Sequence, residues 1–589
     1  MCGIAGKIYL KSGKIDERDL ALMSDKIANR GPDDQGIYIS PDRKVGLVHR
    51  RLAIIDLSAA GHQPMTYKNR YWITFNGEIY NFWAERKKLE KYGYKFKSKS
   101  DTEVILALYD KWGVKCVDHL RGMFAFAIYD IQKQTVFLAR DRVGKKPLKY
   151  FFNSEIFAFA SELKALLILP EIKAEPDTGV LETYLAYGYV PAPQTGFKNI
   201  YKLEPGHYLT LDLKHKTLNK HCYWEIDFTK KLDLSENEWK TQILQTLEES
   251  TRLRMISDVP IGAFLSGGVD SSSIVAMMAK LSAKPIKTFT IGFSETQYDE
   301  SKYAQIVSDI FHTQHTVLQV KPGSVDILPE LAGQFEEPFA DNSALVTYLV
   351  SKLARQYVTV ILNGDGGDEN FTGYAHHLKL QRDYLLSPLA KYFPVGRYLK
   401  SLHHGVLEKY FEYKTHFNFE NPKNVYRSAY QNAKAADIRD KILSADFKYY
   451  LPDDLLAKVD LASMKAALEC RSPLLDYKMA ELAAQIPFAL KVKRNCAKYI
   501  FKKSLEDLLP KEILHRPKMG FSIPLSKWFS QELNPYARSI LLDKKSHINN
   551  VYPKNQIAQM LDEHSEKNDF GPQLWKLLML ELWWKNYFQ

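Results

Sequence analysis

A glycine- and serine-rich stretch at residues 265–272 has residue types that bind an anion and a metal ion. It lies between an apolar run that predicts a buried strand, at 259–265, and one that predicts a helix, at 272–278. Such a turn presents backbone N–H groups and a helix N-terminus to an anion. Asp270 would repel phosphate unless a cation lay between them, so the stretch predicts Mg²⁺ with a nucleotide polyphosphate. A serine-rich helix cap is the alternative.

A second candidate for chemistry is Cys2, directly after the initiator methionine. Because cysteine is small, we expect Met1 to be removed, which makes Cys2 the first residue. Its free α-amine, with an ordinary pKa of about 8, then accepts the thiol proton, and the nucleophile needs no histidine. A small strand residue in second place is the alternative, and the motifs further along the chain decide between the two.

A third group of candidates is acidic. An apolar run at 357–362 predicts a strand, and the loop after it, residues 363–369, holds three carboxylates among three glycines. Ligands bind at the carboxyl ends of the strands in a parallel sheet. We therefore expect Asp368 of this loop to share Mg²⁺ with Asp270, and we disfavour the alternative of a flexible acidic turn.

The elements expected around Cys2 are mostly strands. Residues 122–130 and 136–141 alternate like strands buried on one face. An Asn-Gly turn is expected within residues 75–81, and residues 100–103 are expected to cap a helix at 104–112.

The elements expected around the glycine–serine stretch alternate between strand and helix. After that stretch come strands at 286–293 and 315–320, with a helix at 303–311 between them. This alternation implies a parallel sheet. An amphipathic helix at 238–255 leads into the stretch, and we expect the domain boundary between 210 and 235.

Composition narrows the class of protein. The 589 residues suffice for two or more domains, and 81 basic against 69 acidic residues give a net charge of +12. The basic residues are dispersed, which favours an enzyme with anionic substrates over a nucleic-acid-binding protein. Five cysteines lie far apart without a CxxC pair, so we expect a reducing, cytoplasmic location. We see no signal peptide and no membrane-spanning run, and a homodimer is left open.

Roughly the first 200 residues resemble the N-terminal-nucleophile glutaminase domain of the class II glutamine amidotransferases. The motifs are MCGI at the start, then RGPDD, HRRLAIID, FNGEIYN and SDTE in that order. The resemblance implies that Cys2 attacks glutamine, while the Asn76 side chain and the Gly77 N–H stabilise the oxyanion. It also implies a glutamine-binding set in which Arg51 pairs with the α-carboxylate, and Asp101 with the region of Glu78 binds the α-amine.

The sequence SGGVDSS resembles the pyrophosphate loop of the ATP pyrophosphatases, not a Walker motif. With KVD at 458–460, LECRSPLLD at 468–476 and AKY at 497–499, the second part resembles the synthetase domain of glutamine-hydrolysing asparagine synthetases. The resemblance implies that ATP is bound by Leu265, Ser266, Gly267, Gly268, Asp270, Ser271, Ser272, Ile291, Asn363 and Gly364.

The same resemblance assigns three further residues. Lys498 neutralises charge on the phosphates, and Arg471, like Lys498, offers a cation for the acceptor's α-carboxylate. Asp365 stands where several family members carry a glutamate implicated in forming the acyl-adenylate or guiding ammonia, so its carboxylate reaches one methylene less. Two more departures are Ala497 for glycine and Cys470 for alanine or valine.

The predicted architecture has two domains. Residues 1–215 form an αββα N-terminal-nucleophile glutaminase, and residues 235–589 form an α/β ATP-pyrophosphatase-like synthetase with a parallel sheet. The predicted reaction uses ATP, Mg²⁺ and glutamine to convert aspartate into asparagine through an acyl-adenylate, with ammonia passing through an internal channel. Another carboxylate acceptor, such as a uronic acid of a surface polysaccharide, is the alternative.

Two other classes fit less well. A tRNA-modifying pyrophosphatase leaves MCGI and Asn76–Gly77–Glu78 unexplained, and a non-catalytic scaffold would be expected to have lost Cys2, Asp270 or Asp368. No role is assigned to residues 375–445, where no motif is found.

Overall fold

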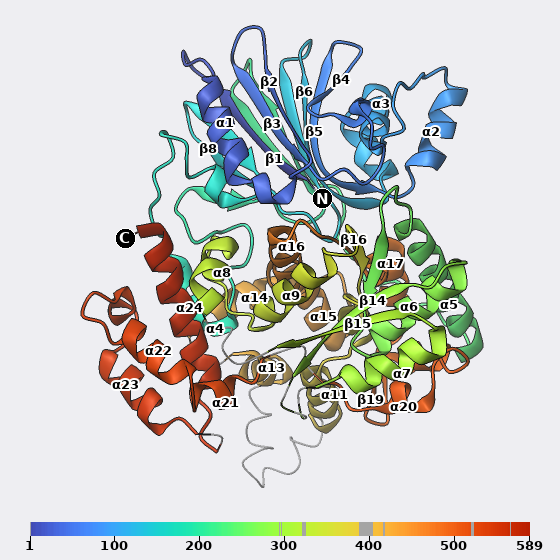
Figure 1. Ribbon diagram of the computed structural model, residues 1–589, viewed down its shortest axis with the longest axis vertical. Helices are drawn as coiled ribbons and strands as arrows, with labels where there is room; N and C mark the ends of the chain where they lie inside the picture. The colour runs from blue at the N-terminus through green and yellow to red at the C-terminus, as the bar shows by residue number, and fades with distance from the viewer. Residues whose placement is uncertain are drawn as a thin grey trace.

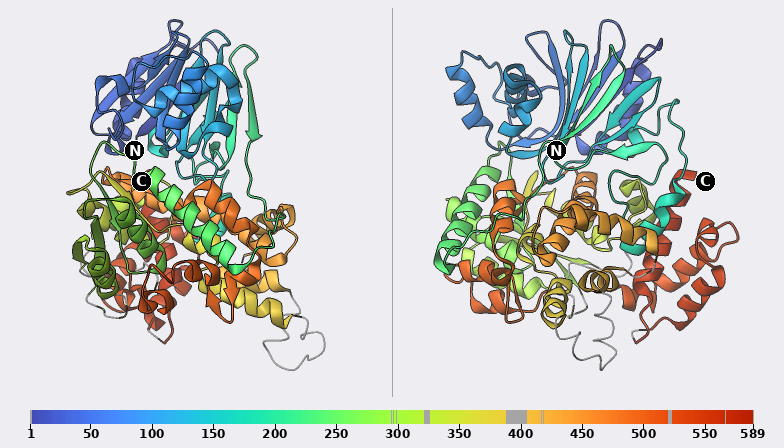
Figure 2. Two further views of the ribbon diagram at one scale, coloured as in Figure 1. Left: turned by 90° about the vertical axis from the view of Figure 1, so that its right-hand side faces the viewer. Right: turned by 180° about the vertical axis from the view of Figure 1, so that it is seen from behind.

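The structure is a computed structural model that describes residues 2–293, 295, 297, 299–320, 326–387, 405–415, 417, 419–519, 523–565 and 567–588. An N-terminal β-rich part is stacked on a C-terminal α/β part, and the chain begins at their junction (Figures 1 and 2). In the described residues, no helix is both long and apolar enough to cross a lipid bilayer.

Two six-stranded antiparallel sheets form the N-terminal part. The first sheet has the order β10-β8-β9-β1-β3-β2, with bounds Ile200–Lys202, Lys149–Phe152, Ile156–Ala160, Gly3–Tyr9, Val45–Arg51 and Asp34–Ile39. The second has the order β12-β11-β7-β6-β5-β4, with bounds Thr217–Cys222, His207–Asp212, Thr135–Arg140, Gly122–Asp130, Tyr71–Ile79 and Met65–Tyr67.

The two sheets face each other across one apolar core, and helices cover their outer faces. Ile4 and Leu47 of the first sheet share a buried cluster with Ala127 and Leu138 of the second. Helix α1 (Glu17–Lys26) packs on β1 and β3, and α3 (Asp101–Trp112) packs on β4 and β5, beside α2 (Phe82–Lys91). The predicted αββα sandwich is confirmed.

Alternation along β6 shows how the sequence builds these layers. Ala125 and Ala127 lie in the core between the sheets, while Phe124 and Phe126 lie in the core beneath α2 and α3. Successive strand residues point to opposite faces, so the small and large side chains separate. The expectation that this strand is buried on one face was wrong, because every residue after Gly122 is buried.

The link between the two parts follows the last strand of the second sheet. Strand β12 (Thr217–Cys222) pairs with β11 and extends beyond residue 215. Helix α5 (Glu236–Arg254) then opens with a capping box in which Ser235 and Glu238 bond each other's backbone N–H groups. We propose that the domain boundary lies in residues 223–235.

A five-stranded parallel sheet forms the centre of the C-terminal part. Its order is β15-β14-β13-β16-β17, with bounds Gln314–Val320, Lys287–Phe293, Ile261–Phe264, Val360–Leu362 and Glu469–Arg471. One face packs against α8 (Leu328–Phe335), α9 (Ser343–Ala354) and α16 (Leu456–Lys465), and the other against α5, α6 (Val269–Leu281) and α7 (Ser301–Phe311). The predicted parallel sheet is confirmed.

The remaining helices surround this sheet. Beyond β16 lie α10 (Gly367–Phe371), α11 (Ala375–Leu386), α13 (Val406–Lys414), α14 (Glu420–Asn432) and α15 (Ile438–Lys448). After β17 come α17 (Tyr477–Gln485), α18 (Phe488–Lys491), α19 (Tyr499–Ser504), α20 (Lys511–His515), α21 (Leu525–Phe529), α22 (Leu533–Leu541), α23 (Lys554–Glu563) and α24 (Gly571–Phe588). A short hairpin, β18 (Val492–Lys493) and β19 (Cys496–Ala497), precedes α19.

Candidate active sites

The candidate nucleophile Cys2 directly precedes β1 and is 8% exposed. Its backbone N–H donates to Asn76 Oδ1 over 3.1 Å. Once Met1 is removed, this nitrogen is the α-amine expected to accept the thiol proton. Burial raises the pKa of the Cys2 thiol above its ordinary value, so a nearby base is needed to form the thiolate.

The two candidate oxyanion donors lie next to Cys2, inside a strand. Asn76 and Gly77 are in β5, opposite Ala125 and Phe124 of β6, so the expected Asn-Gly turn was wrong. Asn76 Nδ2 is buried and has no hydrogen-bond acceptor in the described part of the chain. Gly77 has φ +153°, and a Cβ there would lie 2.1 Å from the Met123 carbonyl oxygen. A glycine is therefore needed, and a free amide donor remains for an oxyanion.

Two buried carboxyl groups and one arginine surround the expected glutamine site. Asp101, the first residue of α3, accepts the Ile79 N–H over 2.9 Å, and burial raises its pKa to about 6. Burial also raises the pKa of Glu78 well above its ordinary value, with the neighbouring Asp101 charge acting in the same direction. Arg51 ends β3 and donates to the carbonyl oxygens of Asp56, over 2.5 Å, and Ser58, over 3.2 Å.

Arg30, a buried arginine, bonds the backbone of Cys2 and pairs with a residue of the C-terminal part, and the sequence did not predict either contact. Arg30 Nε donates to the Cys2 carbonyl over 3.0 Å. Its two terminal nitrogens lie 2.8 Å from Glu162 and 2.7 Å from Asp460, which belongs to α16 of the C-terminal part. The RGPDD motif pointed to Arg30 only as part of a turn, because its partners are far along the chain. Cys2 is thereby connected to the second domain through one side chain.

The glycine–serine stretch forms the predicted turn between β13 and α6. Gly267 has φ +68°, and Gly268 is the N-cap of α6. The Ser272 hydroxyl is buried and has no hydrogen-bond partner among the described residues. The acidic loop approaches closely, since a Cβ on Gly367 would lie 2.2 Å from Asp270 Oδ1. The turn leaves backbone and hydroxyl groups for a phosphate.

The other expected ATP-binding residues lie within or directly after three neighbouring strands of the same sheet. Leu265 follows β13, Ile291 lies within β14, and both are buried. Asn363 and Gly364 follow β16, and a Cβ on Gly364 would lie 2.7 Å from the Ser271 nitrogen. The adjacent strands β13, β14 and β16 therefore gather all the expected ATP-binding residues.

Lys498 joins the two carboxylates expected at the metal site. Its Nζ lies 2.7 Å from Asp368 Oδ1 and also contacts Asp270 Oδ2. Lys518 lies 2.6 Å from the other oxygen of Asp368. Burial would lower the pKa of Lys498, but the Asp270 and Asp368 charges outweigh it and raise the pKa. The two lysines could neutralise the charge of a polyphosphate, and the two carboxylates could bind its metal ion.

Asp365, expected to act in acyl-adenylate formation or in guiding ammonia, and Arg471, expected to bind the acceptor, lie in two different places. Asp365 accepts the Asn363 side-chain N–H over 2.6 Å, and burial raises its pKa to about 6 despite the nearby Lys458 charge. Arg471 is fully buried elsewhere and contacts Glu469 over 2.7 Å, the carbonyls of Arg254 and Ile256, and Glu78 over 3.2 Å. The Arg471 guanidinium therefore lies at the interface with the glutaminase half. Lys458, which pairs with Asp341 over 2.9 Å and lies near Asp365, is the better candidate for the cation that binds the acceptor's α-carboxylate.

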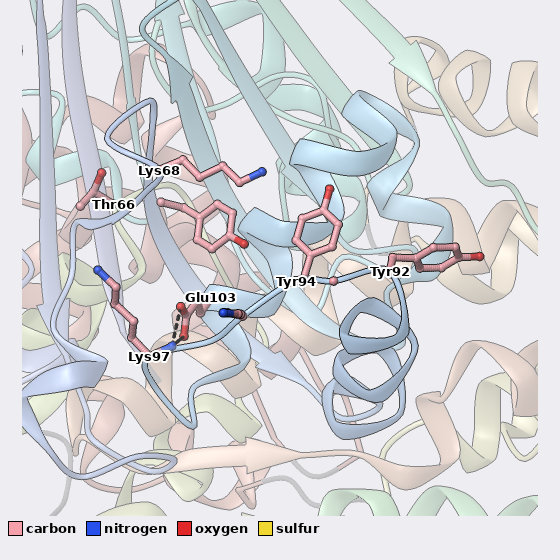
Figure 3. A pocket seen from close by; sticks show the side chains of 9 residues that line it. Thr66, Lys68, Tyr92, Tyr94, Lys97 and Glu103 are labelled. Atoms are coloured by element: carbon pink, nitrogen blue, oxygen red, sulfur yellow. Dashed lines mark hydrogen bonds between the residues drawn. The ribbon is translucent and has the colours of Figure 1, made fainter.

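A broad surface hollow lies apart from these residues, on the glutaminase sandwich. It has a volume of about 510 Å³ and is lined by Thr66, Tyr67, Lys68, Tyr92, Gly93, Tyr94, Lys95, Lys97 and Glu103. Figure 3 shows Glu103 bonded to the backbone of Lys97 below the rings of Tyr92 and Tyr94. None of the expected catalytic or ATP-binding residues lines it.

The fold and the two groups of residues define a class: an N-terminal-nucleophile glutaminase joined to an ATP-pyrophosphatase-like synthetase. A family model described as "Glutamine amidotransferase domain" matches residues 1–224, and one described as "Asparagine synthase" matches residues 242–585. The asparagine synthase match alone covers more than half of the chain.

Curated relatives extend this match over the whole length. Asparagine synthetase [glutamine-hydrolyzing] 1 of Bacillus subtilis is 33% identical, with 99% of this chain and 96% of the relative covered. Putative asparagine synthetase [glutamine-hydrolyzing] 2 of Methanocaldococcus jannaschii is 40% identical, over 67% of this chain and 80% of the relative. Amidase chry2 of Gibberella zeae is 28% identical, over 87% of this chain and 86% of the relative. The chain belongs to the glutamine-hydrolysing asparagine synthetase family.

Proposed function

We propose that the protein makes asparagine from aspartate and ATP, using ammonia that it releases from glutamine. The observation that carries the proposal is the position of helix α16. Its Asp460 pairs with Arg30 behind Cys2, while its Lys458 reaches Asp341 and the neighbourhood of Asp365. Two residues apart on one helix, these side chains join the surroundings of the two candidate sites.

In the glutaminase half, the proposed reaction begins with the Cys2 thiolate and the side-chain amide of glutamine. The α-amine of Cys2 takes the thiol proton, and the new C–S bond places negative charge on the amide oxygen. Asn76 Nδ2 and the Gly77 N–H stabilise that charge, and each such donor is worth about 10²–10³ in rate. Ammonia leaves, and water hydrolyses the thioester to glutamate and regenerates Cys2.

The glutamine backbone is held by charges of opposite sign. Arg51 is proposed to bind the α-carboxylate with its planar guanidinium. Asp101 and Glu78 are proposed to bind the α-ammonium, which would restore the ionised form of carboxyl groups whose pKa burial has raised.

In the synthetase half, the β-carboxylate of aspartate attacks the α-phosphorus of ATP and displaces pyrophosphate. The turn from Ser266 to Ser272 is proposed to hold the pyrophosphate, and Lys498 to balance its charge. Asp270 Oδ1 is buried and lacks a hydrogen-bond donor among the described residues, which fits a cation ligand, and Asp368 supplies a second carboxylate. Mg²⁺, when bound there, supplies charge neutralisation on the phosphates.

Ammonia then attacks the acyl carbon and displaces AMP. Because free ammonia is protonated in water, we propose a protected path between the two sites. The path would follow α16 and strand β17 (Glu469–Arg471), which pairs with β16 next to the acidic loop and places Arg471 on Glu78. The five cysteines, none of which is paired in a disulfide, support a reducing cytoplasm as the location.

Two observations favour a second class of acceptor. Asp365 is one methylene shorter than the glutamate carried by several family members, and the relative called amidase chry2 covers nearly the same length. An amidotransferase for another carboxylate, such as a uronic acid, would keep the glutaminase and the ATP chemistry unchanged.

The test supplies ammonia, Mg²⁺, ATP and aspartate, and measures asparagine, AMP and pyrophosphate. Equal yields of all three are expected. AMP formation with a uronic acid but none with aspartate would replace the proposal by the second acceptor class.

The metal assignment is tested with Asp270→Asn and Asp368→Asn. Both variants are expected to lose pyrophosphate release while glutamine hydrolysis continues, and normal pyrophosphate release by both would remove these residues from the metal site.

A further inference from the structure

Two histidines from the segment 375–445, which carries no recognised motif, form a group with Asp446, the residue directly after that segment. His376 and His377 open helix α11, and Asp446 lies on α15. One oxygen of Asp446 faces both imidazoles, at 3.6 Å from His377 Nε2 and 3.9 Å from His376 Nε2. The three ligand atoms all lie within 4.8 Å of one another.

Three of the four imidazole nitrogens in this group make no hydrogen bond to any residue that the structure describes. His377 is 1% exposed, and neither of its ring nitrogens makes a hydrogen bond within the described part of the chain. His376 Nε2 is likewise buried and unbonded to any described residue. Buried polar atoms are nearly always hydrogen-bonded, so three such nitrogens in one place point to a ligand.

The donor set fits a transition metal. Neutral imidazole nitrogens together with a carboxylate oxygen are donors that Zn²⁺ accepts, and metal bonds of ~2.0–2.1 Å in a tetrahedral site separate the donors by roughly 3.3 Å. The carboxylate-to-histidine separations of 3.6 and 3.9 Å need only small side-chain rotations to reach that value. We propose that His376, His377 and Asp446 bind a divalent transition-metal ion of the Zn²⁺ type.

The surroundings of the group leave the donors available. Lys414 occupies the other oxygen of Asp446 at 2.8 Å, and the Tyr410 hydroxyl bonds the facing oxygen. A carboxylate oxygen has two lone pairs, so it can accept this hydroxyl and still bind a metal. A water molecule would complete a tetrahedral set of four ligands.

The site is positioned to affect the acidic loop without belonging to the ATP site. The Tyr374 ring stacks on His376 at 5.1 Å, and its hydroxyl bonds Glu369 of α10. A metal here would hold the start of α11 against α15 beside Glu369. This metal site does not depend on the identity of the acceptor.

The test measures Zn²⁺ binding by the full-length protein with Cys2→Ala as background, without nucleotide and against a competing chelator. We expect one ion per chain. The double variant His376→Gln/His377→Gln should weaken Zn²⁺ binding by more than ~10–100-fold, which is the cost of losing a residue that only hydrogen-bonds a metal ligand. His119→Gln, which changes a histidine outside the group, is the control and should bind like the background protein.

Two further measurements keep the outcome clear if the double variant folds poorly. Co²⁺ substitution should give visible absorption of a nitrogen–oxygen site without a thiolate charge-transfer band. Lys414→Met should tighten Zn²⁺ binding, because it removes the competing cation on Asp446. Absence of a bound ion, a thiolate spectrum, or equal binding by background and double variant would overturn the proposal.

Discussion

Arg30 is the residue whose replacement should reveal most about how the two halves are joined. Arg30→Met leaves Glu162 and Asp460 buried without their shared cation and frees the Cys2 carbonyl. Removing one partner of a buried ion pair costs about 3–5 kcal/mol. Glu162 keeps Lys164 at 2.5 Å and Asp460 keeps Lys146 at 3.1 Å. We therefore expect the lower end of that range, about 3 kcal/mol.

Urea unfolding and two rate assays measure this effect. The unfolding midpoint should fall, and glutamine-dependent amide formation should fall more than ammonia-dependent formation, because Arg30 positions Cys2 directly. Arg252→Met is the matched control: its own side chain is 61% exposed and pairs with Glu248 one helical turn away, so the loss should be about 0–1 kcal/mol. Equal midpoints and equal glutaminase rates for the two variants would refute the reasoning.

Two predictions concern the glutamine site. Gly77→Ala should lower glutamine hydrolysis about 100-fold or more while ammonia-dependent synthesis persists, because its Cβ would lie 2.1 Å from the Met123 carbonyl oxygen and displace an oxyanion donor. Gly93→Ala is the control, since Gly93 also has a positive φ, +86°, but no atom lies within 4 Å of its Cβ. Similar losses of glutamine hydrolysis in both variants would count against the assignment. Asp101 has a pKa raised to about 6 and binds a cation only when ionised, so the KM for glutamine should rise about tenfold per pH unit as the pH falls below 6. Asp101→Asn should have a high KM at every pH, and a wild-type KM independent of pH from 5 to 8 would contradict this role.

The sequence predicted the parts of the fold that depend on local pattern. The order of strands and helices around Ser266–Ser272 led to the observed parallel sheet. The apolar runs at 122–130 and 136–141 located strands β6 and β7, although β6 is buried on both faces. The Asn76–Gly77 turn was wrong because pairing with β6, whose residues lie nearly 50 positions away, extends the strand through a pair that locally favours a turn.

Contacts between distant residues explain the other differences. Arg471 was assigned to the acceptor by its motif, yet its guanidinium meets Glu78 across the domain interface. Arg30 and Asp460 form their pair over 430 positions, and His376 and His377 meet Asp446 only because α11 packs beside α15. Burial and opposite charge select such pairs, and neither is visible in residue spacing.

Two separate reactions that share ammonia are the central claim, and Cys2→Ala tests it most directly. The measurement compares the rate of amide formation with glutamine and with ammonium as nitrogen donor, in the variant and in the unaltered protein. We expect no product from glutamine and a nearly unchanged rate with ammonium. Loss of both rates in a variant that still unfolds at the unaltered protein's urea midpoint would contradict the claim.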